Sequence, residues 1–404
     1  MQSILKNAID SQEQLPVLIL AGGQGNGLFP LTIARPKPGL AFGPCRIVDF
    51  TLSNCRNSGL RDCALLTQYR RDQLAVHIRR NWNREYRCLS AALGKRYRGT
   101  AHAVYQNLLC MENAQHVLIL AGDHVYQMDY QKLIRRHLET EADLTLSTVL
   151  FPLSQASNFG VVEVGADFRV KRFVEKPAAP RPLPHRAASA VVSMGIYVFK
   201  VQVLVDALHR HCNAGSGFDF GFHIVPSLID SRRVYTYNFC DEATGVPLYW
   251  RDVGTIDSYY SASMDLLRAQ PPFDLWSGTL PRDESLGRPS VDSAARVSHT
   301  MLCDGVRVAE GAEIEDCVLM PGSTIGRGAR LRRVIVDEGV QIPEGFRAGW
   351  DMEADRQDHI VSPGGIVVIS HAPRPAPMRP VREQVSAPAR RESDTPVRSR
   401  QEGA

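Results

Sequence analysis

The sequence predicts an α/β fold with a mostly parallel sheet, followed by a C-terminal domain of stacked β coils. The apolar runs Val17 to Leu20 and Val117 to Leu120 have the length and composition of buried parallel strands. Between residues 47 and 115, helical spacing alternates with strand-like runs, as it does in βαβ units. From about residue 300, short apolar pairs recur between glycines and small residues, which favours a β-solenoid over an ordinary small β domain.

The composition, the net charge and the cysteine pattern restrict the class of protein to which this chain can belong. The chain has 404 residues, 44% of them hydrophobic and 22% charged, as expected of a globular protein with a large core. Its net charge is only +4, and the segment 371–404 carries seven arginines against four acidic residues. The body is therefore nearly neutral, which argues against a nucleic-acid groove. Nine scattered cysteines without a CxxC pair, no secretory leader and no membrane-length apolar run predict a cytoplasmic protein with reduced thiols and no membrane association.

The first predicted strand ends in a glycine cluster. Gly22, Gly23 and Gly25 follow it directly, and backbone amides without a neighbouring Cβ can approach a phosphate closely. Downstream, Lys37 stands between two prolines that hold it in a stiff extended segment, from which its ammonium can reach the same phosphates. The alternative, left open at this point, is that the glycines form only a tight turn.

The second strong strand ends in a carboxylate. Gly122 and Asp123 follow the apolar run at 117–120, so Asp123 is expected at the carboxyl edge of the sheet, where α/β folds bind ligands. Mg²⁺ is commonly held by one or two carboxylates together with phosphate oxygens and water. The competing interpretation makes Asp123 the N-cap of a helix beginning at Tyr130, but that helix starts several residues later.

These motifs and later ones carry a resemblance. LAGGxGxxL…RPKP, RIVDFTLSNCRNSGL, the segment YRGTA at 97–101, FVEKP at 173–177 and YWRDVGT at 249–255 are similar to the motifs of the bacterial ADP-glucose pyrophosphorylase family. The likeness extends to about Ile369. It implies a Rossmann-like nucleotidyltransferase sheet with a C-terminal left-handed β-helix.

The resemblance also implies chemistry. The family joins ATP and glucose 1-phosphate to give ADP-glucose and pyrophosphate in glycogen synthesis, with Mg²⁺ as the cofactor. It assigns catalytic roles to Lys37 and Asp123, metal binding to Asp123 and Asp252, and phosphate binding to the glycine turn. The residues that the family pattern assigns to glucose 1-phosphate are Tyr97, Gly160, Glu175, Lys176 and Ser193.

Three departures from the family pattern keep a second hypothesis open. Gln24 and Gly27 stand where the family has arginines, Phe222 where it has a lysine, and the adenine-binding segment is shortened between Asn83 and Arg96. The chain is therefore either an active adenylyltransferase or a weak or inactive paralogue that modulates an active partner or binds sugar phosphate only. If Gly27 limits catalysis, restoring an arginine there should raise turnover.

Regulation and assembly are also expectations from the resemblance. Relatives bind sugar bisphosphates and AMP in a basic cleft, of which Arg35 and Arg46 remain here, while Ala34, Ala41 and Cys110 replace other polar or basic positions. A weak effector response is expected, because a bisphosphate needs several cations to offset its desolvation. The family implies a homotetramer, or a hetero-oligomer with an active paralogue.

The expected domain boundaries follow changes in residue composition and hydrophobic pattern along the chain. It comprises an N-terminal extension (1–15), a catalytic domain (16–268), a linker (269–290), the β-helix (291–370) and a disordered tail rich in proline and arginine (371–404).

Overall fold

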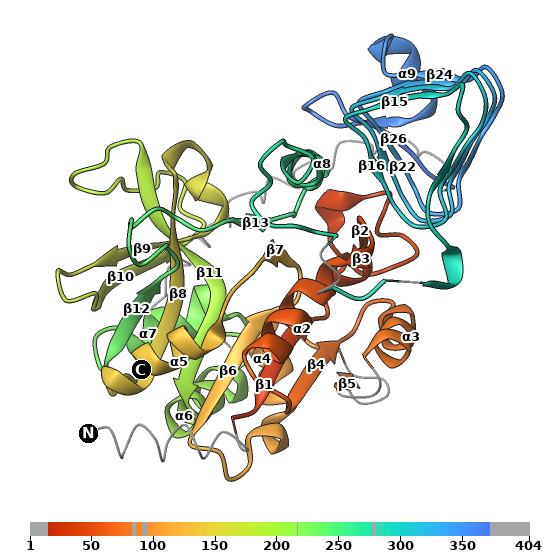
Figure 1. Ribbon diagram of the computed structural model, residues 1–404. Helices are drawn as coiled ribbons and strands as arrows, with labels where there is room; N and C mark the ends of the chain where they lie inside the picture. The colour runs from red at the N-terminus through yellow and green to blue at the C-terminus, as the bar shows by residue number, and fades with distance from the viewer. Residues whose placement is uncertain are drawn as a thin grey trace, which may run out of the picture. The chain divides into compact units, whose positions relative to one another are not determined.

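A nine-stranded sheet forms the centre of the catalytic half (Figure 1). The computed structural model describes residues 15–82, 86–90, 96–215, 217–276, 280–282 and 284–371. Across the sheet run β10 (Val170–Glu175), β9 (Gly160–Val164), β11 (Ser189–Lys200), β6 (His116–Ala121), β1 (Val17–Ala21), β4 (Cys63–Thr67) and β5 (Arg87–Ser90), with β8 (Leu144–Pro152) paired to β11 and β12 (Val234–Asn238) paired to β8.

One half of this sheet is purely parallel. β1 pairs in parallel with β4 and β6, and β4 pairs in parallel with β5. The register sets Ala21 beside Thr67 and Leu20 beside Ala121, so the carboxyl ends of three strands meet at one edge. β11 is antiparallel to β6, β8 and β9 and makes the other half mixed. The segments that follow β1, β4 and β6 therefore lie together, as ligand-binding loops of α/β sheets do.

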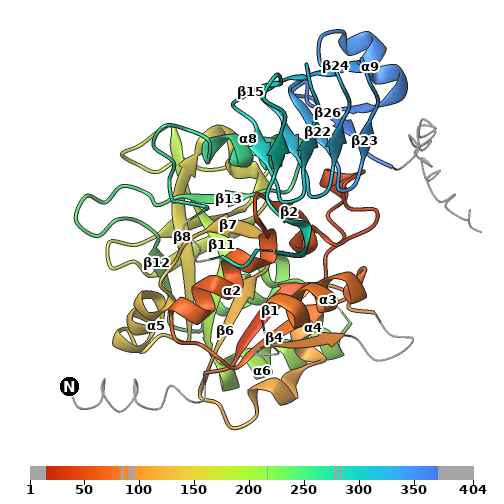
Figure 2. The ribbon, with the colours of Figure 1, turned by 45° about the vertical axis from the view of Figure 1, so that its right-hand side comes forward.

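Helices cover both faces of the sheet (Figure 2). Along β1, Val17 and Ile19 belong to one core and Leu18 to the other, as the alternation of strand side chains requires. The first core includes side chains of α2 (Ile47–Asn57), α3 (Arg71–Asn81) and α5 (Tyr130–Glu139). The second includes side chains of α4 (Thr100–Tyr105), α6 (Val201–Asn213), the π-helix η6 (Phe220–Ile224) and α7 (Val225–Leu228).

A short two-stranded ribbon stands beside the large sheet. β7 (His124–Tyr126) pairs in antiparallel fashion with β13 (Trp250–Asp252), and its register sets Asp252 beside His124. Trp250 packs edge-on against Phe151 and Phe159, which fixes the ribbon on the core. This pairing brings together two chain segments far apart in the sequence.

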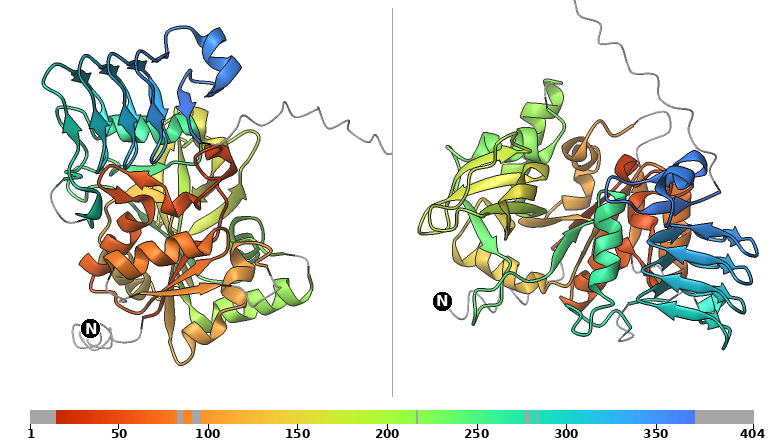
Figure 3. Two further views of the ribbon diagram at one scale, coloured as in Figure 1. Left: turned by 90° about the vertical axis from the view of Figure 1, so that its right-hand side faces the viewer. Right: turned by 90° about the horizontal axis from the view of Figure 1, so that it is seen from above.

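The C-terminal half is a stack of β coils (Figure 3). Two sheets keep a parallel repeat of 17 residues throughout, so that Ser290, Arg307, Thr324 and Gln341 lie one above another. The third sheet keeps this repeat from β16 to β22 and then adds β26 in parallel and β25 in antiparallel orientation. Glycines at the corners, among them Gly322 at φ 69°, adopt the left-handed conformation that the tight corners need. The strands are β14 (Ser290–Val291), β15 (Arg296–Ser298), β16 (Met301–Leu302), β17 (Arg307–Val308), β18 (Glu313–Glu315), β19 (Val318–Leu319), β20 (Thr324–Ile325), β21 (Arg330–Arg332), β22 (Val334–Val336), β23 (Gln341–Ile342), β24 (Arg347–Ala348), β25 (Ile360–Val361) and β26 (Val367–Ile369).

The coils pack on the catalytic half through one apolar cluster. Phe42, Phe50 and Tyr259 of the catalytic half share a core with Met301 and Ile335 of the coils. The three residues of the catalytic half come from β2 (Ala41–Phe42), which pairs with β3 (Cys45–Arg46), from α2, and from α8 (Ile256–Asp265). In the C-terminal half, a last helix, α9 (Met352–Asp358), precedes β25. The two halves form one compact unit through residue 372.

The predicted α/β class and β-solenoid agree with this architecture. The proposed domain boundaries remain a prediction, and the expected extension at 1–15 and tail at 371–404 lie almost wholly outside the described residues, as does most of the shortened segment at 83–96. Within the described part of the chain, no helix combines the length and apolar character that crossing a bilayer requires.

Candidate active site

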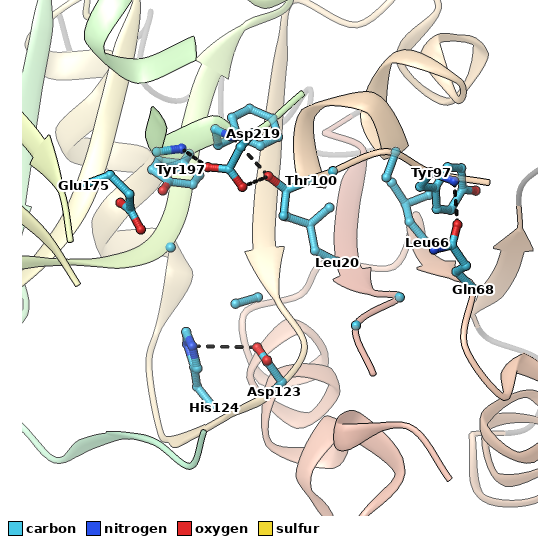
Figure 4. Close-up of a pocket in the computed structure, with 18 residues that line it drawn as sticks. Leu20, Leu66, Gln68, Tyr97, Thr100, Asp123, His124, Glu175, Tyr197 and Asp219 are labelled. Atoms are coloured by element: carbon cyan, nitrogen blue, oxygen red, sulfur yellow. Dashed lines mark hydrogen bonds and ion pairs between the residues drawn. The ribbon is translucent and has the colours of Figure 1, made fainter. Parts of the chain in front are cut away.

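A cavity of about 400 Å³ opens at the carboxyl edge of the parallel strands (Figure 4). It lies where β1, β4 and β6 end and extends towards β10 and η6. Its lining residues are Leu20, Gly22, Gly23, Leu66, Gln68, Tyr97, Gly99, Thr100, Ala103, Ala121, Asp123, His124, Glu175, Gly195, Tyr197, Asp219, Phe220 and Gly221.

Two aspartates converge beside this cavity. Asp123 follows β6, and Asp252 ends β13 in the ribbon that pairs with β7. The Nζ atom of Lys37 lies 3.0 Å from Asp123 Oδ2 and 2.6 Å from Asp252 Oδ1. The predicted catalytic lysine and both predicted metal ligands therefore meet at one point. Asp123 is not the N-cap of α5, because Asp129 fills that position.

Lys37 and Asp123 stabilise each other's charged forms. Burial opposes the charged ammonium of Lys37, but Asp123 and Asp252 outweigh that effect and raise its pKa. Burial likewise opposes the charged form of Asp123, yet Lys37 lowers the pKa of this carboxyl below its usual value. Lys37 is thus held as a cation and Asp123 as an anion.

His124 completes the cluster. Its Nε2 atom lies 3.7 Å from Asp123 and 3.9 Å from Asp252, while its Nδ1 atom accepts a hydrogen bond of 3.3 Å from Trp250 Nε1. Burial lowers the pKa of the imidazole, so the ring is neutral and its Nε2 proton faces the carboxylates. Sequence reasoning did not assign His124 a role, although it directly follows Asp123.

The two carboxylates fit a hard divalent cation. They supply oxygen ligands that already converge on a positive charge, the ammonium of Lys37. No cluster of three or more metal-ligating side chains occurs among the described residues. A Mg²⁺ ion here would depend on phosphate oxygens and water for most of its shell, as Mg²⁺ commonly does.

The glycine turn is shaped by its neighbours. A Cβ at Gly25, where φ is 73°, would lie 2.8 Å from the Cβ of Lys37, so glycine allows the lysine stem to pass. Gly22 lies against Gln68, whereas Gly23 has open space around it. Gly22 and Gly23 line the cavity and Gly25 does not, so the turn supplies both a wall of the pocket and room for Lys37.

Gly27 is packed against a second turn. A Cβ there would lie only 2.3 Å from the carbonyl oxygen of Gly254, two residues after Asp252. Any side chain at 27 therefore requires the 3₁₀ turn η2 (Asn26–Leu28) or the segment after β13 to move. The expectation that an arginine placed here would raise turnover stays a prediction, and this packing argues against it.

Glu175 lies between two glycines on the far side of the cavity. A Cβ at Gly160 would lie 2.8 Å from Glu175 Oε2, and a Cβ at Gly221 would lie 2.3 Å from it. Burial and the negative charge of Asp219 raise the pKa of the Glu175 carboxyl. They outweigh the positive charge of Lys176, which lowers this pKa. Gly160 therefore makes room for the carboxylate but does not itself line the cavity.

The other predicted sugar-site residues lie at different depths. Tyr97 lines the cavity, and its amide donates a 2.5 Å hydrogen bond to Gln68 Oε1. Ser193 is buried beneath the lining, where its Oγ accepts a 3.3 Å hydrogen bond from the amide of Gly195. Lys176 is exposed, with its backbone at φ 46°. Tyr97 thus lines the pocket, whereas Ser193 and Lys176 do not.

Sequence reasoning missed Asp219 and Thr100. Thr100 Oγ1 donates a 3.1 Å hydrogen bond to Asp219 Oδ2 and accepts one from the amide of Phe220. Asp219 Oδ1 in turn accepts from the amides of Gly221 and Phe222 and so caps η6. The sequence signal for Asp219 is the aspartate within FDFGF at 218–222, the segment that also contains Phe222.

The cavity lining is acidic. It contains the carboxylates of Asp123, Glu175 and Asp219, and no lysine or arginine is found among the residues that line it. The charge of phosphate groups entering this space must therefore be neutralised by cations outside the lining, such as Lys37 beside Asp123, or by a bound divalent ion.

The two arginines predicted to bind effectors are already paired. Arg35 Nη1 lies 2.6 Å from Asp337 Oδ1, and Arg46 Nη1 lies 2.9 Å from Glu338 Oε1. A cavity of about 160 Å³ is lined by both arginines, Glu338 and His77, among others. The weak effector response remains a prediction, and the acidic partners supply a further reason for it.

Comparison with known proteins places the chain in a family. Residues 16–269 match the nucleotidyl transferase family, and residues 283–369 match a GlmU-like C-terminal hexapeptide family. The chain is 39% identical over 399 residues to the glucose-1-phosphate adenylyltransferase of Methylococcus capsulatus, covering 88% of this chain and 93% of that protein. It is 40% identical over 391 residues to glucose-1-phosphate adenylyltransferase 2 of Alkalilimnicola ehrlichii, with the same coverage.

A third relative, the glucose-1-phosphate adenylyltransferase of Paramagnetospirillum magneticum, is 40% identical over 396 residues, which is 87% of this chain and 92% of that protein. The chain therefore belongs to the nucleotidyl transferase family, in the group formed by the glucose-1-phosphate adenylyltransferases. The predicted family is confirmed. The fold class is confirmed too, because parallel sheets built from hexapeptide-type coils are the architecture expected of a left-handed β-helix.

Proposed function

We propose that this chain is a glucose-1-phosphate adenylyltransferase, which converts ATP and α-D-glucose 1-phosphate to ADP-glucose and pyrophosphate in glycogen synthesis. One observation carries the proposal beyond family membership: Asp123 and Asp252, 129 positions apart, converge on Lys37 at the sheet edge beside an open cavity. Because both substrates are metabolites of the cytoplasm, we place the reaction there.

The reaction needs positioning and charge neutralisation more than covalent chemistry. A phosphate oxygen of glucose 1-phosphate attacks the α-phosphorus of ATP, the new P–O bond forms in line with the bond to the β-phosphate, and that bond breaks to release pyrophosphate. A Mg²⁺ ion held by Asp123 and Asp252 would neutralise phosphate charge. Lys37 supplies a fixed ammonium at the same point, and Gly22 and Gly23 line the cavity, where their amides are our candidate donors to phosphate oxygens.

Glucose binding is assigned to the opposite wall. Glu175, lodged between Gly160 and Gly221, presents a carboxylate that can accept hydrogen bonds from sugar hydroxyls. Tyr97 lines the same space, and Lys176, the exposed residue that directly follows Glu175, is our candidate cation for the sugar phosphate. Ser193 acts from beneath by holding the amide of Gly195. A homotetramer, or a hetero-oligomer with an active paralogue, is the assembly we propose from the resemblance.

The test of this function is pyrophosphate release, measured with glucose 1-phosphate and each nucleoside triphosphate in turn. We expect release that depends on glucose 1-phosphate, is fastest with ATP and stops when Mg²⁺ is chelated. Release that is fastest with another triphosphate would overturn the choice of base.

The second candidate, a weak or inactive paralogue, is favoured by the packing of Gly27 against Gly254 and by the acidic lining of the cavity. No release with any triphosphate, together with calorimetric binding of glucose 1-phosphate, would support this candidate.

Replacing Lys176 with alanine is expected to weaken glucose 1-phosphate binding about tenfold, because one charge-assisted contact to phosphate is lost at an exposed site. Calorimetry with glucose 1-phosphate measures the change. Lys171→Ala is the matched control, since Lys171 is an exposed lysine on β10, the strand that Lys176 directly follows. Equal affinities in the two variants would remove Lys176 from the sugar site.

A further inference from the structure

Two acidic residues of the β coils reach into the catalytic half. Asp337 and Glu338 follow β22, and the carboxylate of Asp337 also accepts a 2.8 Å hydrogen bond from the amide of Glu338. We refer to Asp337 and Glu338 as the acidic pair. Their side chains are only 9% and 20% exposed, so the acidic pair is largely shielded from solvent and salt.

The acidic pair holds both ends of the short segment that carries Lys37. At the first end, Arg35 contacts Asp337 at 2.6 Å and Glu338 at 3.7 Å. At the second end, Nη1 of Arg46 donates a 2.5 Å hydrogen bond to the carbonyl of Gly39 and contacts Glu338 at 2.9 Å. Residues 35–39 are thereby tied at one end to both carboxylates and at the other end, through Arg46, to Glu338 alone.

The position of this segment determines where the ammonium of Lys37 lies relative to Asp123 and Asp252. Prolines at 36 and 38 restrict its backbone, and the amides of Gly39 and Leu40 close a tight turn around Lys37. On the other side, the ammonium of Lys37 sits between Asp123 and Asp252. A shift of either end of so short and stiff a segment moves the lysine relative to the carboxylates.

We propose that Asp337 and Glu338 are positioning residues for catalysis: through Arg35 and Arg46 they hold the Lys37 segment in register with Asp123 and Asp252. The β coils thus contribute directly to the order of the active site, in addition to packing on the catalytic half. The part of this proposal that concerns turnover rests on the proposed function, whereas the part that concerns the order of the segment does not.

The experiment compares Glu338→Gln and Asp337→Asn with Glu310→Gln. Glu310 is the matched control, because it lies before a corner glycine of the same coils and pairs with Arg327, but both side chains are more than half exposed. Hydrogen exchange of the peptide that covers residues 37–42 is the primary measurement, with the β1 peptide as the internal reference. We expect the Gly39 and Leu40 amides to exchange at least about tenfold faster in the two test variants, with β1 and the control unchanged.

The kinetic measurement separates positioning from general destabilisation. The test variants are expected to lose about tenfold in kcat with KM for glucose 1-phosphate within about twofold, because the sugar wall lies on the far side of the cavity. If either test variant fails to fold, Arg46→Gln replaces it, because the shorter and uncharged side chain cannot form the ion pair with Glu338.

The outcomes distinguish the two claims. Unchanged exchange at residues 37–42 in folded variants would overturn the proposal, as would exchange that rises equally in β1. Unchanged kcat in an active enzyme whose segment loosens would overturn the catalytic role. Faster exchange in a chain with no activity would support the ordering of the segment and count only against the proposed function.

Discussion

Replacing Asp123 with asparagine is expected to lower kcat by on the order of a thousandfold, because a metal ligand that neutralises phosphate charge contributes several kcal/mol to the transition state. Asparagine keeps the shape of the side chain but removes the negative charge that faces Lys37 at 3.0 Å. Pyrophosphate release measures kcat, and calorimetry with Mg²⁺ in the presence of ATP measures the loss of the metal site.

A matched control lies in the same stretch of chain. Asp129→Asn removes an exposed carboxylate six residues later, where Asp129 caps α5, and asparagine is an equally good N-cap. It should leave kcat and melting temperature unchanged. A folded Asp123→Asn variant that retains more than about a tenth of wild-type kcat would show that Asp123 is not a principal ligand.

Asp252→Asn tests the second carboxylate separately. Its effect should resemble that of Asp123→Asn, and the double variant should lose less than the product of the two single losses. The reason is that both carboxylates act on the same ammonium and the same proposed ion. Independent, multiplicative losses would indicate that the two residues serve different steps.

Substituting Gly27 with arginine is expected to lower both turnover and stability, contrary to what comparison with the family pattern alone suggests. A Cβ at 27 would lie 2.3 Å from the carbonyl oxygen of Gly254, closer than side chains approach backbone atoms. Overpacking of this kind costs about 1–3 kcal/mol, and relief requires movement of the turn that follows Asp252. The Asp252 carboxylate would then leave its position beside Lys37.

Alanine variants isolate the steric part of this prediction. Gly27→Ala adds only the Cβ and should lower the melting temperature by several degrees, by roughly the shift that a few kcal/mol produces. Gly23→Ala is the control, because a Cβ at 23 meets nothing within 4 Å. An arginine variant with higher turnover than wild type would show that the Gly254 turn yields, and that the missing cation was the limiting defect.

The sequence by itself was sufficient for the local features. The apolar runs at 17–20 and 117–120 lie in β1 and β6, and the alternation of helix and strand expected between 47 and 115 includes α2, β4 and α3. Each of these depends on periodicity and composition within a single segment, which the chain encodes locally. The family motifs likewise named Lys37 and Asp123, because these residues lie within short, specific patterns.

One residue of the site was missed within a single short segment of the sequence. Comparison with the family pattern in this segment concerned only Phe222, which stands where the family has a lysine. It gave no role to Asp219, which stands three residues earlier and lines the cavity. The assignment of Lys176 to the sugar phosphate stays a prediction, because the structure shows only that the residue is exposed and does not line the cavity. A motif identifies which residues matter more reliably than it identifies where their side chains lie.

Only the tertiary structure decided the contacts between distant segments. The pairing of β7 with β13 set Asp252 beside His124, the approach of Gly254 excluded a side chain at Gly27, and the β coils supplied Glu338 to Arg46. No local spacing encodes such contacts, because they depend on strand register and on how whole elements pack. Short motifs therefore identify the chemical groups of this protein. The geometry of those groups depends on packing between segments that lie 128 to 292 positions apart.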